Sequence, residues 1–481
     1  MSTEAISESE FLREFTREVQ NKNAAVFAGA GLSMGSGYVD WKGLLKDVIV
    51  DLGLDPDREH DLVTLAQYHC NKAKGNRGRL AQVILDHFGT TRAPTKNHHI
   101  LASLPIRTYW TTNYDKLLEK ALEAAKKVPD AKHTVSQLSA TRPDRDVIVY
   151  KMHGDVEHST DAVISKDDYE RYERKMEPFI AALRGDLVAK TFLFLGFSFT
   201  DPNIDYILSR VRVQYEDSQR PHYCIQKKVT RNSGESKVDF EYRELKQHYF
   251  IGDLKRFGIL TVLVVDYDGI TALLGKVAAI YKRTSIFISG AAENYGTWAE
   301  ADAKAFLFKL GHEFTAGNRV VSGFGIGVGS AVLNGVLTQL DSLGKSVTDE
   351  RAVLRPFPQL DGGKGSKLRW TEYRRALIEY AGIAIFVFGN YRDPAGTVAL
   401  SDGMREEFDI CVTAGVIPIP VGATGFMAEV LWKQVSANLG KFVPSADARF
   451  KKDFAKLGDV TLNATQLVQL LRKLVARLQN N

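Results

Sequence analysis

The chain has 481 residues, of which 44% are hydrophobic and 25% are charged, and its formal net charge at pH 7 is +5. This length is too great for one ordinary hydrophobic core, so it predicts two domains, and the composition is that of a soluble globular protein. Basic and acidic residues are interspersed without a long run of Lys or Arg, which argues against binding to nucleic acid.

The cysteines and the apolar segments bear on compartment, metal binding and membrane association. Cys70, Cys224 and Cys411 lie far apart and none belongs to a C-x-x-C pair, which argues against a disulfide framework and a four-cysteine zinc site. The start of the chain is acidic and lacks the apolar core of a signal peptide, and the longest apolar runs are too short to span a bilayer. We therefore expect a cytoplasmic protein that needs no metal and no membrane.

The first half of the chain begins with a helix predicted over roughly residues 8–21, because Phe11, Phe15 and Val19 recur at helical spacing. Short apolar runs then alternate with helical stretches. Strands that are apolar throughout and alternate with helices predict a parallel sheet covered on both faces. The predicted strands are AAVFAGAG, TYWTTN, VIVYKMHG and TFLFLGFS, with further apolar runs at HYCIQ and TVLVVDY.

The same pattern starts again near Thr284, which places a domain boundary there. A strand, TSIFISGA, precedes a helix predicted over about 297–316, and a second strand, NRVVSG, precedes the glycine-dense loop GFGIGVGS and another helix. AVLRPFP, GIAIFVFG and VIPIPVG are three more predicted strands, and leucines at helical spacing mark a last helix. The sequence therefore predicts an α/β protein with domains at residues 1–283 and 284–481.

Four polar or glycine-rich motifs follow predicted strands of the first domain. They are GAGLS at 29–33, TTNYD at 111–115, KMHG at 151–154 and GFSFTDPN at 196–203. Ligands of open α/β sheets lie outside the carboxyl ends of strands, so the four motifs are expected to meet in one crevice. Glycines in the first motif let the backbone approach a pyrophosphate at the start of the following helix.

Each motif taken alone also has an ordinary structural interpretation. The glycine loop is then a tight turn without a ligand, and Asn113 is a turn residue. His153 is a histidine with satisfied hydrogen bonds, and Asp201 is a helix cap before Pro202. The presence of all four motifs at strand ends favours a binding site.

In this order and spacing, the four motifs resemble those of the sirtuin-like (SIR2) superfamily, over about residues 15–267. The resemblance implies a Rossmann-like domain that binds NAD and breaks its nicotinamide–ribose bond. It implies that Asn113 positions the attacking water, that Asp115 lies beside the nicotinamide ribose, and that His153 contacts the ribose hydroxyls as a general base or orienting group. It places Gly29, Ala30, Gly31 and Ser33 on the pyrophosphate, and Gly196 and Ser198 on the adenosine side.

Departures from the superfamily pattern limit the range of substrates that this chain is expected to use. Protein-deacylating sirtuins usually carry a structural zinc held by two C-x-x-C pairs, which this chain lacks, and it has GYVDW where their pattern continues toward Asp-Phe-Arg. Both differences disfavour acyl-lysine substrates and favour water as the nucleophile, hence NAD hydrolysis. An NAD-dependent protein deacylase and a non-catalytic nucleotide-sensing scaffold are the alternatives, and the retained Asn113 and His153 argue against the scaffold.

The second domain contains a second set of candidate ligand contacts. Its glycine-dense loop is typical of an anion cradle at a helix N-terminus, or of a turn needed only for close strand–helix packing. Arginine can clamp phosphate and carboxylates can accept from ribose hydroxyls, although a solvated helix face is the ordinary interpretation of such pairs. The residues concerned are Gly323, Gly325, Gly327 and Gly329 in the loop, Arg374 and Arg375, and Glu406 and Glu407.

This half resembles the SLOG family of Rossmann-like nucleotide sensors, from about Thr284 to the end of the chain. The related phosphoribohydrolases carry a PGG-x-GT-x-x-E motif; FPQLDGGKGS lacks that order and REEFD retains only acidic residues. We therefore expect a binding module without that catalysis. The expected effector contacts are Ser289, Gly290, Gly323, Gly325, Gly327, Glu407 and one of Arg374 and Arg375.

A SIR2-like domain followed by a SLOG domain resembles the effectors of Thoeris antiphage defence. The stretches GNRGR, YWTTNYD, YKMHGDVEH, FLFLGFSFTDPN and VSGFGIGVGS carry this resemblance over nearly the whole chain. It implies a bacterial homotetramer that depletes NAD in infected cells. It also implies activation by a cyclic ADP-ribose isomer, which a TIR-domain partner makes and the SLOG domain binds.

Overall fold

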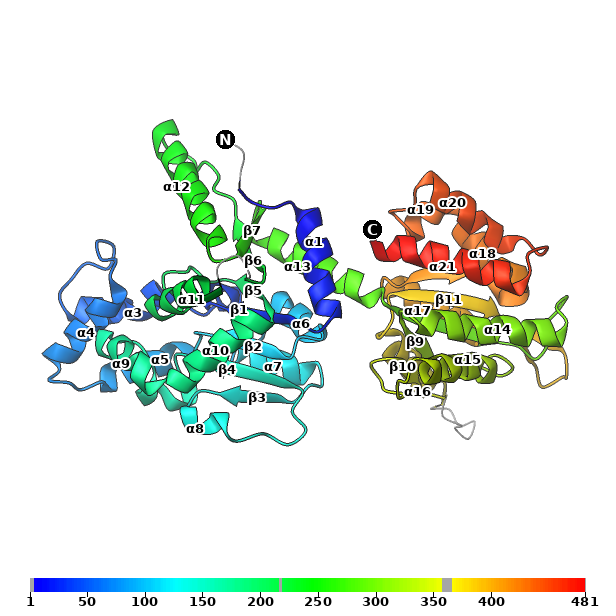
Figure 1. Cartoon of the computed structure of the whole chain (residues 1–481), viewed down its shortest axis with the longest axis horizontal. Coiled ribbons are helices and arrows are strands. Elements are labelled where there is room, and N and C mark those ends of the chain that lie inside the picture. The colour runs from blue at the N-terminus through cyan, green and yellow to red at the C-terminus, as the bar shows by residue number, and fades with distance from the viewer. Residues whose placement is uncertain (1–3, 216–218, 357–365, 481) are drawn as a thin grey trace. The chain divides into compact units, whose positions relative to one another are not determined.

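A computed structural model describes residues 4–215, 219–356 and 366–480 (Figure 1). By its internal contacts the chain divides into two compact units, Met1–Ala278 and Ala279–Asn481. The division falls within helix α13 (Tyr267–Lys282), slightly before the boundary expected from the sequence.

The first unit is built on a seven-stranded sheet in the order β3-β4-β2-β1-β5-β6-β7. All neighbouring strands run parallel, and β1 and β5 are buried along their whole length. The sequence therefore correctly predicted a parallel sheet and all of its strands except β3. The strands are β1 (Ala24–Ala28), β2 (Thr108–Thr111), β3 (Pro129–Lys132), β4 (Val147–Lys151), β5 (Thr191–Leu195), β6 (His222–Lys227) and β7 (Ile259–Val264).

Strand β3 was missed because its sequence, PDAK, is neither apolar nor β-branched. It lies at the sheet edge and pairs with β4 alone. A proline is tolerated there because an edge strand need not donate every backbone N–H to a neighbour. Asp130 and Lys132 form an ion pair at 2.8 Å and are both buried.

Helices lie on both faces of this sheet (Figure 1). Helix α1 confirms the first predicted helix. Ser7 caps it, and Phe11 and Phe15 stack on each other and meet Tyr223 of β6 edge-on. The helices of the first unit are α1 (Glu8–Gln20), α2 (Ala30–Met34), α3 (Trp41–Asp51), α4 (Leu62–Lys72), α5 (Gly78–Phe88), α6 (Lys96–Ser103), α7 (Leu117–Ala124), α8 (Val135–Leu138), η1 (Val156–Asp161), α9 (Lys166–Lys175), α10 (Glu177–Ala189), α11 (Pro202–Tyr215), α12 (Lys237–Lys255) and the start of α13.

The second unit has a five-stranded sheet in the order β10-β9-β8-β11-β14, again with parallel neighbours. The predicted strands of this half are all present; of AVLRPFP, Ala352–Leu354 form β10, Arg355 and Pro356 are not in a strand, and the last two residues lie outside the described ranges. The strands are β8 (Ser285–Ala291), β9 (Arg319–Ser322), β10 (Ala352–Leu354), β11 (Ile383–Phe388) and β14 (Ile417–Pro420).

A small antiparallel hairpin, β12 (Asn390–Arg392) and β13 (Val398–Leu400), was not predicted. Its strands are mostly exposed and have no apolar periodicity. The turn between them is closed by backbone hydrogen bonds between Asp393 and Thr397 and between Gly396 and Asp393. The D-P-A-G sequence of this turn was the available signal.

The second unit's helices cover its sheet and complete its core. The last helix buries Leu467, Leu471, Leu474 and Leu478 of the predicted stripe, whereas Leu470 is only partly buried. The helices are α14 (Glu300–Thr315), α15 (Gly329–Ser342), α16 (Ser366–Ile378), α17 (Asp402–Thr413), η3 (Gly422–Thr424), α18 (Phe426–Ala437), α19 (Leu439–Phe442), α20 (Ala448–Ala455), η4 (Lys456–Gly458) and α21 (Ala464–Asn480).

In each sheet the strands that follow the first strand are added on one side of it and then on the other. In the first unit β1 lies between β2 and β5, and in the second β8 lies between β9 and β11. Loops that leave such a pair of strands diverge, which opens a crevice at their carboxyl ends. In the described ranges no helix is long and apolar enough to cross a membrane.

Candidate functional site

The GAG loop after β1 and the loop after β5 are in direct backbone contact. The Gly29 N–H donates to Leu195 O and the Gly31 N–H to Gly196 O, each at 2.9 Å. A Cβ atom at Gly29 would lie 2.4 Å from Gly196 O, and one at Gly196, where φ is +63°, would lie 2.2 Å from Leu32 N. The contact between the two loops therefore requires glycine at these positions whether or not a ligand is bound.

A chain of hydrogen bonds joins TTNYD to the GAG loop. The Asn113 amide nitrogen donates to Gly29 O and to Ser33 Oγ, each at 3.0 Å, and Ser33 Oγ donates to Asp115 Oδ2 at 2.7 Å. Asp115 Oδ1 also accepts from the Leu117 backbone N–H. Because a carbonyl oxygen can only accept, the Gly29 contact decides which end of the Asn113 amide is nitrogen. Asn113 Oδ1 accepts no hydrogen bond from the described residues.

The His153 ring is completely buried among aromatic rings. Its centroid lies 6.1 Å from that of Trp41, 5.6 Å from Tyr169 and 6.4 Å from Tyr172, all edge-on. Its Nε2 atom is 3.2 Å from Asp201 Oδ2, yet neither ring nitrogen makes a hydrogen bond of good geometry to a described residue. A buried polar atom without a partner is costly, so the missing partner of Nδ1 argues against a core histidine with both ring nitrogens satisfied.

Asp201 has two roles, of which the sequence predicted only the helix cap. Its Oδ1 accepts from the backbone N–H groups of Asn203 and Ile204 at 3.0 Å, which confirms the helix-cap interpretation. Its Oδ2 faces His153 and accepts from the Tyr169 hydroxyl at 3.1 Å. Burial raises the pKa of Asp201, but the neighbouring His153 and these hydrogen bonds outweigh burial and leave that pKa lowered.

Lys151 links the KMHG motif to the TTNYD motif through hydrogen bonds to backbone carbonyls. Its side chain is fully buried, and its ammonium donates to Tyr114 O at 3.1 Å, to Asp115 O at 2.6 Å and to Glu119 Oε1 at 3.2 Å, and also to Asp155. Burial raises the pKa of Glu119 although Lys151 opposes the shift. Sequence reasoning missed this lysine, because nothing in the motif distinguishes a buried ammonium from a solvated one.

Two predicted nucleotide contacts lie at the margins of this arrangement. Ala30 is the first residue of α2 and is partly buried. Ser198 is exposed, and its hydroxyl is hydrogen-bonded to Thr200 at 2.8 Å. The structure thus brings Gly29, Gly31, Ser33, Asn113, Asp115 and Gly196 together, whereas no described hydrogen bond joins Ser198 to them.

In the second unit, four predicted or neighbouring polar residues meet between β8, α16 and α17. Ser289 Oγ donates to Glu407 Oε2 at 2.5 Å, Arg374 Nη1 donates to Glu406 Oε2 at 2.6 Å, and Arg374 Nε lies 3.6 Å from Glu407 Oε1. Burial raises the pKa of Glu407 although Ser289 and Arg374 oppose the shift. Arg375 is exposed, so the geometry separates the two arginines that the sequence could not distinguish.

The glycine-dense loop packs against the end of β8. A Cβ atom at Gly325 would lie 1.8 Å from Gly290 O, and one at Gly327, where φ is +70°, would lie 1.9 Å from Ala292 O. Gly323 is buried directly after β9. Close strand–loop packing is therefore one reason for these glycines. Of the FPQLDGGKGS stretch, residues 357–365 lie outside the described residues.

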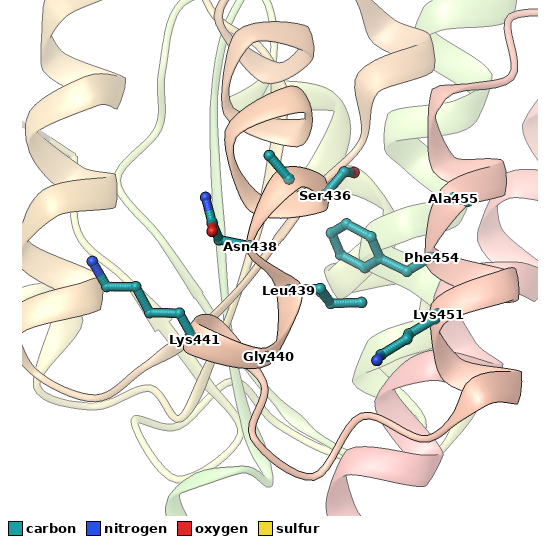
Figure 2. A pocket seen from close by; sticks show the side chains of 9 residues that line it. Ser436, Asn438, Leu439, Gly440, Lys441, Lys451, Phe454 and Ala455 are labelled. Carbon is teal, nitrogen blue, oxygen red and sulfur yellow. The ribbon is translucent and has the colours of Figure 1, made fainter.

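Among the described residues, the second unit has at least two cavities. One, of about 490 Å³, lies between α18–α19 and α20, where Phe454 points toward Leu439 and Ser436 (Figure 2). Its described lining includes none of the predicted effector residues. The other, of about 1060 Å³, is lined by Tyr295, Trp298 and Lys304 among others, and it includes Gly327 of the glycine-dense loop.

Comparison with known proteins identifies the family. The family model described as "SIR2-like domain" matches residues 107–251, and that described as "Sir2- and TIR-associating SLOG family" matches residues 269–478. A protein named NAD(+) hydrolase ThsA from Bacillus cereus (strain MSX-D12) is 50% identical over 471 residues, which cover 98% of each chain. The chain belongs to the ThsA family. A ThsA relative from Acinetobacter baumannii (strain 532279) is 43% identical and covers 95% of this chain and 96% of that protein.

The two family models confirm the resemblances to SIR2-like and SLOG domains, and the two parallel sheets confirm the fold class. A weaker match, to "Defense-associated sirtuin 2" of Bacillus subtilis, is 28% identical and covers 49% of this chain but 24% of that protein. The residues whose roles sequence reasoning overlooked at the first site are Trp41, Lys151 and Tyr169, although Trp41 stands in GYVDW and Lys151 in KMHG.

Proposed function

We propose that the chain hydrolyses NAD⁺ to nicotinamide and ADP-ribose. Two relatives that match nearly its full length are named NAD(+) hydrolase. The observation on this chain that carries the proposal is the Asn113–Ser33–Asp115 chain of hydrogen bonds, which holds the Asn113 amide with Oδ1 available to accept. A water held by Oδ1 has a lone pair directed away from Asn113.

The reaction breaks the bond between ribose C1′ and the nicotinamide nitrogen, and the electron pair leaves with neutral nicotinamide. The oxocarbenium-like ribose then takes the oxygen of water, and one proton is released overall. Asn113 contributes by orienting that water, and His153 by a hydrogen bond between its Nδ1 atom, which has no partner among the described residues, and a ribose hydroxyl. Lys151 holds the TTNYD backbone in place beneath them.

The SIR2 resemblance supports placing the nucleotide's diphosphate at the GAG loop and its adenosine at the loop that begins at Gly196. The two loops touch through Gly29, Gly31 and Gly196, so a ligand bound to one is positioned by the other. Ser33 lies in the interior of α2, with its hydroxyl committed to Asp115. Its side chain therefore has no hydroxyl proton left to donate to the pyrophosphate.

The second unit is proposed to be the switch. A cyclic ADP-ribose isomer has the phosphates and ribose hydroxyls that Arg374, Ser289 and Glu407 can recognise. The matching family model is described as associating with Sir2 and TIR, which supports a TIR-domain protein as the source of that signal. We propose that the activated protein is a cytoplasmic homotetramer that depletes NAD in antiphage defence.

Chromatography of NAD⁺ after incubation with the purified chain tests both parts. Nicotinamide and ADP-ribose that appear only with one cyclic ADP-ribose isomer would support hydrolysis and the switch. NAD⁺ loss without any isomer would retain the enzyme and reject the switch. Intact NAD⁺ with every isomer would reject the proposed hydrolysis, and release of nicotinamide only with an acyl-lysine peptide would replace it by deacylation.

A further inference from the structure

Helix α12 presents an apolar stripe that no described residue of the first unit covers. Val238, Tyr242, Leu245 and Tyr249 are 74%, 66%, 36% and 68% exposed. The helix extends away from the seven-stranded sheet (Figure 1). Single exposed apolar residues are ordinary, but four on one helix at spacings of four, three and four form a continuous stripe.

The opposite face of α12 is the one that holds it to the unit. Arg243 bonds to Glu235 and to Thr230 O, and Gln247 bonds to Lys227 O and the Val229 N–H. Further along, Ile251 and Leu254 are buried. The exposed stripe is therefore not needed to attach the helix, and its apolar character has no explanation within the unit.

The spacing of the stripe is that of a coiled-coil seam. Residues at alternating intervals of four and three occupy the a and d positions of a heptad, with Tyr242 and Tyr249 at a and Val238 and Leu245 at d. In an antiparallel pair an a residue packs beside a d residue, so Tyr242 would meet Leu245 of the other copy, and Val238 would meet Tyr249. The stripe is thus complementary to itself.

The flanking charges are complementary in the same arrangement. Asp239 and Lys246 both occupy e positions, and both are exposed. An antiparallel two-fold axis between residues 243 and 244 places Asp239 of each copy beside Lys246 of the other. On the other flank, Glu241 lies beside His248 of the other copy.

The anchoring of α12 favours this direction over a parallel one. Its C-terminal turns pack on the sheet through Ile251 and Leu254, whereas paired helices lie only roughly 8–10 Å apart. A parallel pair would bring two sheets together at the same end of the pair. An antiparallel pair places the two units at opposite ends, where they have room.

We propose that the exposed stripe of α12 is an interface between two copies of this chain, formed by antiparallel two-fold pairing of the helix. The inference deepens the proposed homo-oligomer and assigns part of its contact surface. It is independent of whether the chain hydrolyses NAD⁺, because it is tested by molecular mass and not by turnover.

Light scattering coupled to size-exclusion chromatography of the full-length chain tests the seam. Leu245→Glu places a charge at its centre and is expected to raise the dissociation constant of the α12 contact at least about thirtyfold. The assembly should therefore become smaller than that of the wild type. Glu244→Lys, at the neighbouring exposed position outside the seam, is the control and should keep the wild-type mass. Circular dichroism checks that both variants are folded.

Exchange of charges tests the direction of pairing. Lys246→Glu alone and Asp239→Lys alone should each weaken the assembly, and the double variant should restore it, because each copy again offers opposite charges. A mixture of the two single variants should associate as well. The helix dipole also favours acids near the start of α12 and bases near its end. Each single substitution weakens this interaction with the dipole, and the double variant weakens it further. Restored assembly in the double variant would therefore come from the pairing of charges between copies and not from the dipole.

Three results would overturn the proposal. A wild-type chain that is monomeric at micromolar concentration rejects the self-interface altogether. A Leu245→Glu variant with unchanged mass removes α12 from the interface and leaves the proposed oligomer standing. Rescue of Lys246→Glu by Glu241→Lys, and not by Asp239→Lys, would show a parallel pair and reject the antiparallel one.

Discussion

At the scale of single residues, the first unit assembles its site from side chains that are held by the backbone of other motifs. The Asn113 amide is oriented by the Gly29 carbonyl of the GAG loop. The Ser33 hydroxyl links it to Asp115, because it accepts from Asn113 and donates to the Asp115 carboxylate. His153 is held by the rings around it and by its proximity to Asp201. The geometry of each motif therefore depends on its neighbours.

Replacement of Asn113 by Ala is expected to lower kcat/KM for NAD⁺ by at least about a hundredfold, because the water loses its orienting oxygen. Nicotinamide release measured by chromatography gives the value. Asn71→Ala, which removes an exposed amide on α4, is the control and should stay near wild type. Full activity of the Asn113 variant would show that another group orients the water.

The lowered pKa of Asp201 makes part of the folding stability dependent on pH. Since the folded-state pKa lies below the unfolded value of about 3.9, the stabilisation is complete above that value and is lost as pH falls through the folded pKa. Asp201→Asn should therefore be less stable than wild type at neutral pH, with a difference that shrinks in acid. Urea unfolding from about pH 3 to about pH 7 measures this difference. A difference independent of pH would contradict the assigned role of the carboxylate.

At the scale of elements, contact between the loops after β1 and β5 determines where glycine is required. A Cβ atom at Gly196 would collide with the Leu32 nitrogen, and the backbone there is left-handed. Gly185 in α10 has open space around it, and a Cβ atom there would meet nothing within 4 Å. Two glycines in one unit thus have opposite expected responses to the same substitution.

Gly196→Ala is expected to lower the free energy of unfolding by at least about 2 kcal/mol, through steric overlap and backbone strain. Gly185→Ala should raise it by about 0.5–1 kcal/mol, because alanine favours an exposed helix interior. Denaturant unfolding of both variants provides the comparison. Equal effects of the same sign would show that the close approach of the two loops is not rigid.

At the scale of the whole molecule, the chain combines a unit proposed for chemistry with a unit proposed for sensing. A ligand can shift a conformational equilibrium only by its differential affinity for the two states. In the second unit, the groups able to supply such a difference are the buried Glu407, its partner Ser289, and Arg374. The exposed Arg375 makes no described contact with them.

The two arginines therefore give a matched test of the switch. Arg374→Ala should raise the concentration of cyclic ADP-ribose isomer needed for half-maximal NAD⁺ loss at least about tenfold, as expected for removal of a charged hydrogen-bonding partner. Arg375→Ala, with the same loss of charge at an exposed position, should change that concentration little. A larger effect from Arg375 would reverse the assignment.

The sequence by itself determined the two parallel α/β units and most of the site motifs, because buried strands and glycine turns leave local patterns. The polar edge strand β3 and the strands of the exposed hairpin β12–β13 leave no such pattern, and only the hairpin's D-P-A-G turn does, since the position of these strands comes from pairing. Only the tertiary structure decided that Lys151 is buried beneath TTNYD, that Asp201 both caps α11 and faces His153, and that Arg374 and not Arg375 meets Glu407. Each of these depends on which distant backbone lies within a few ångströms, and local spacing does not encode that proximity.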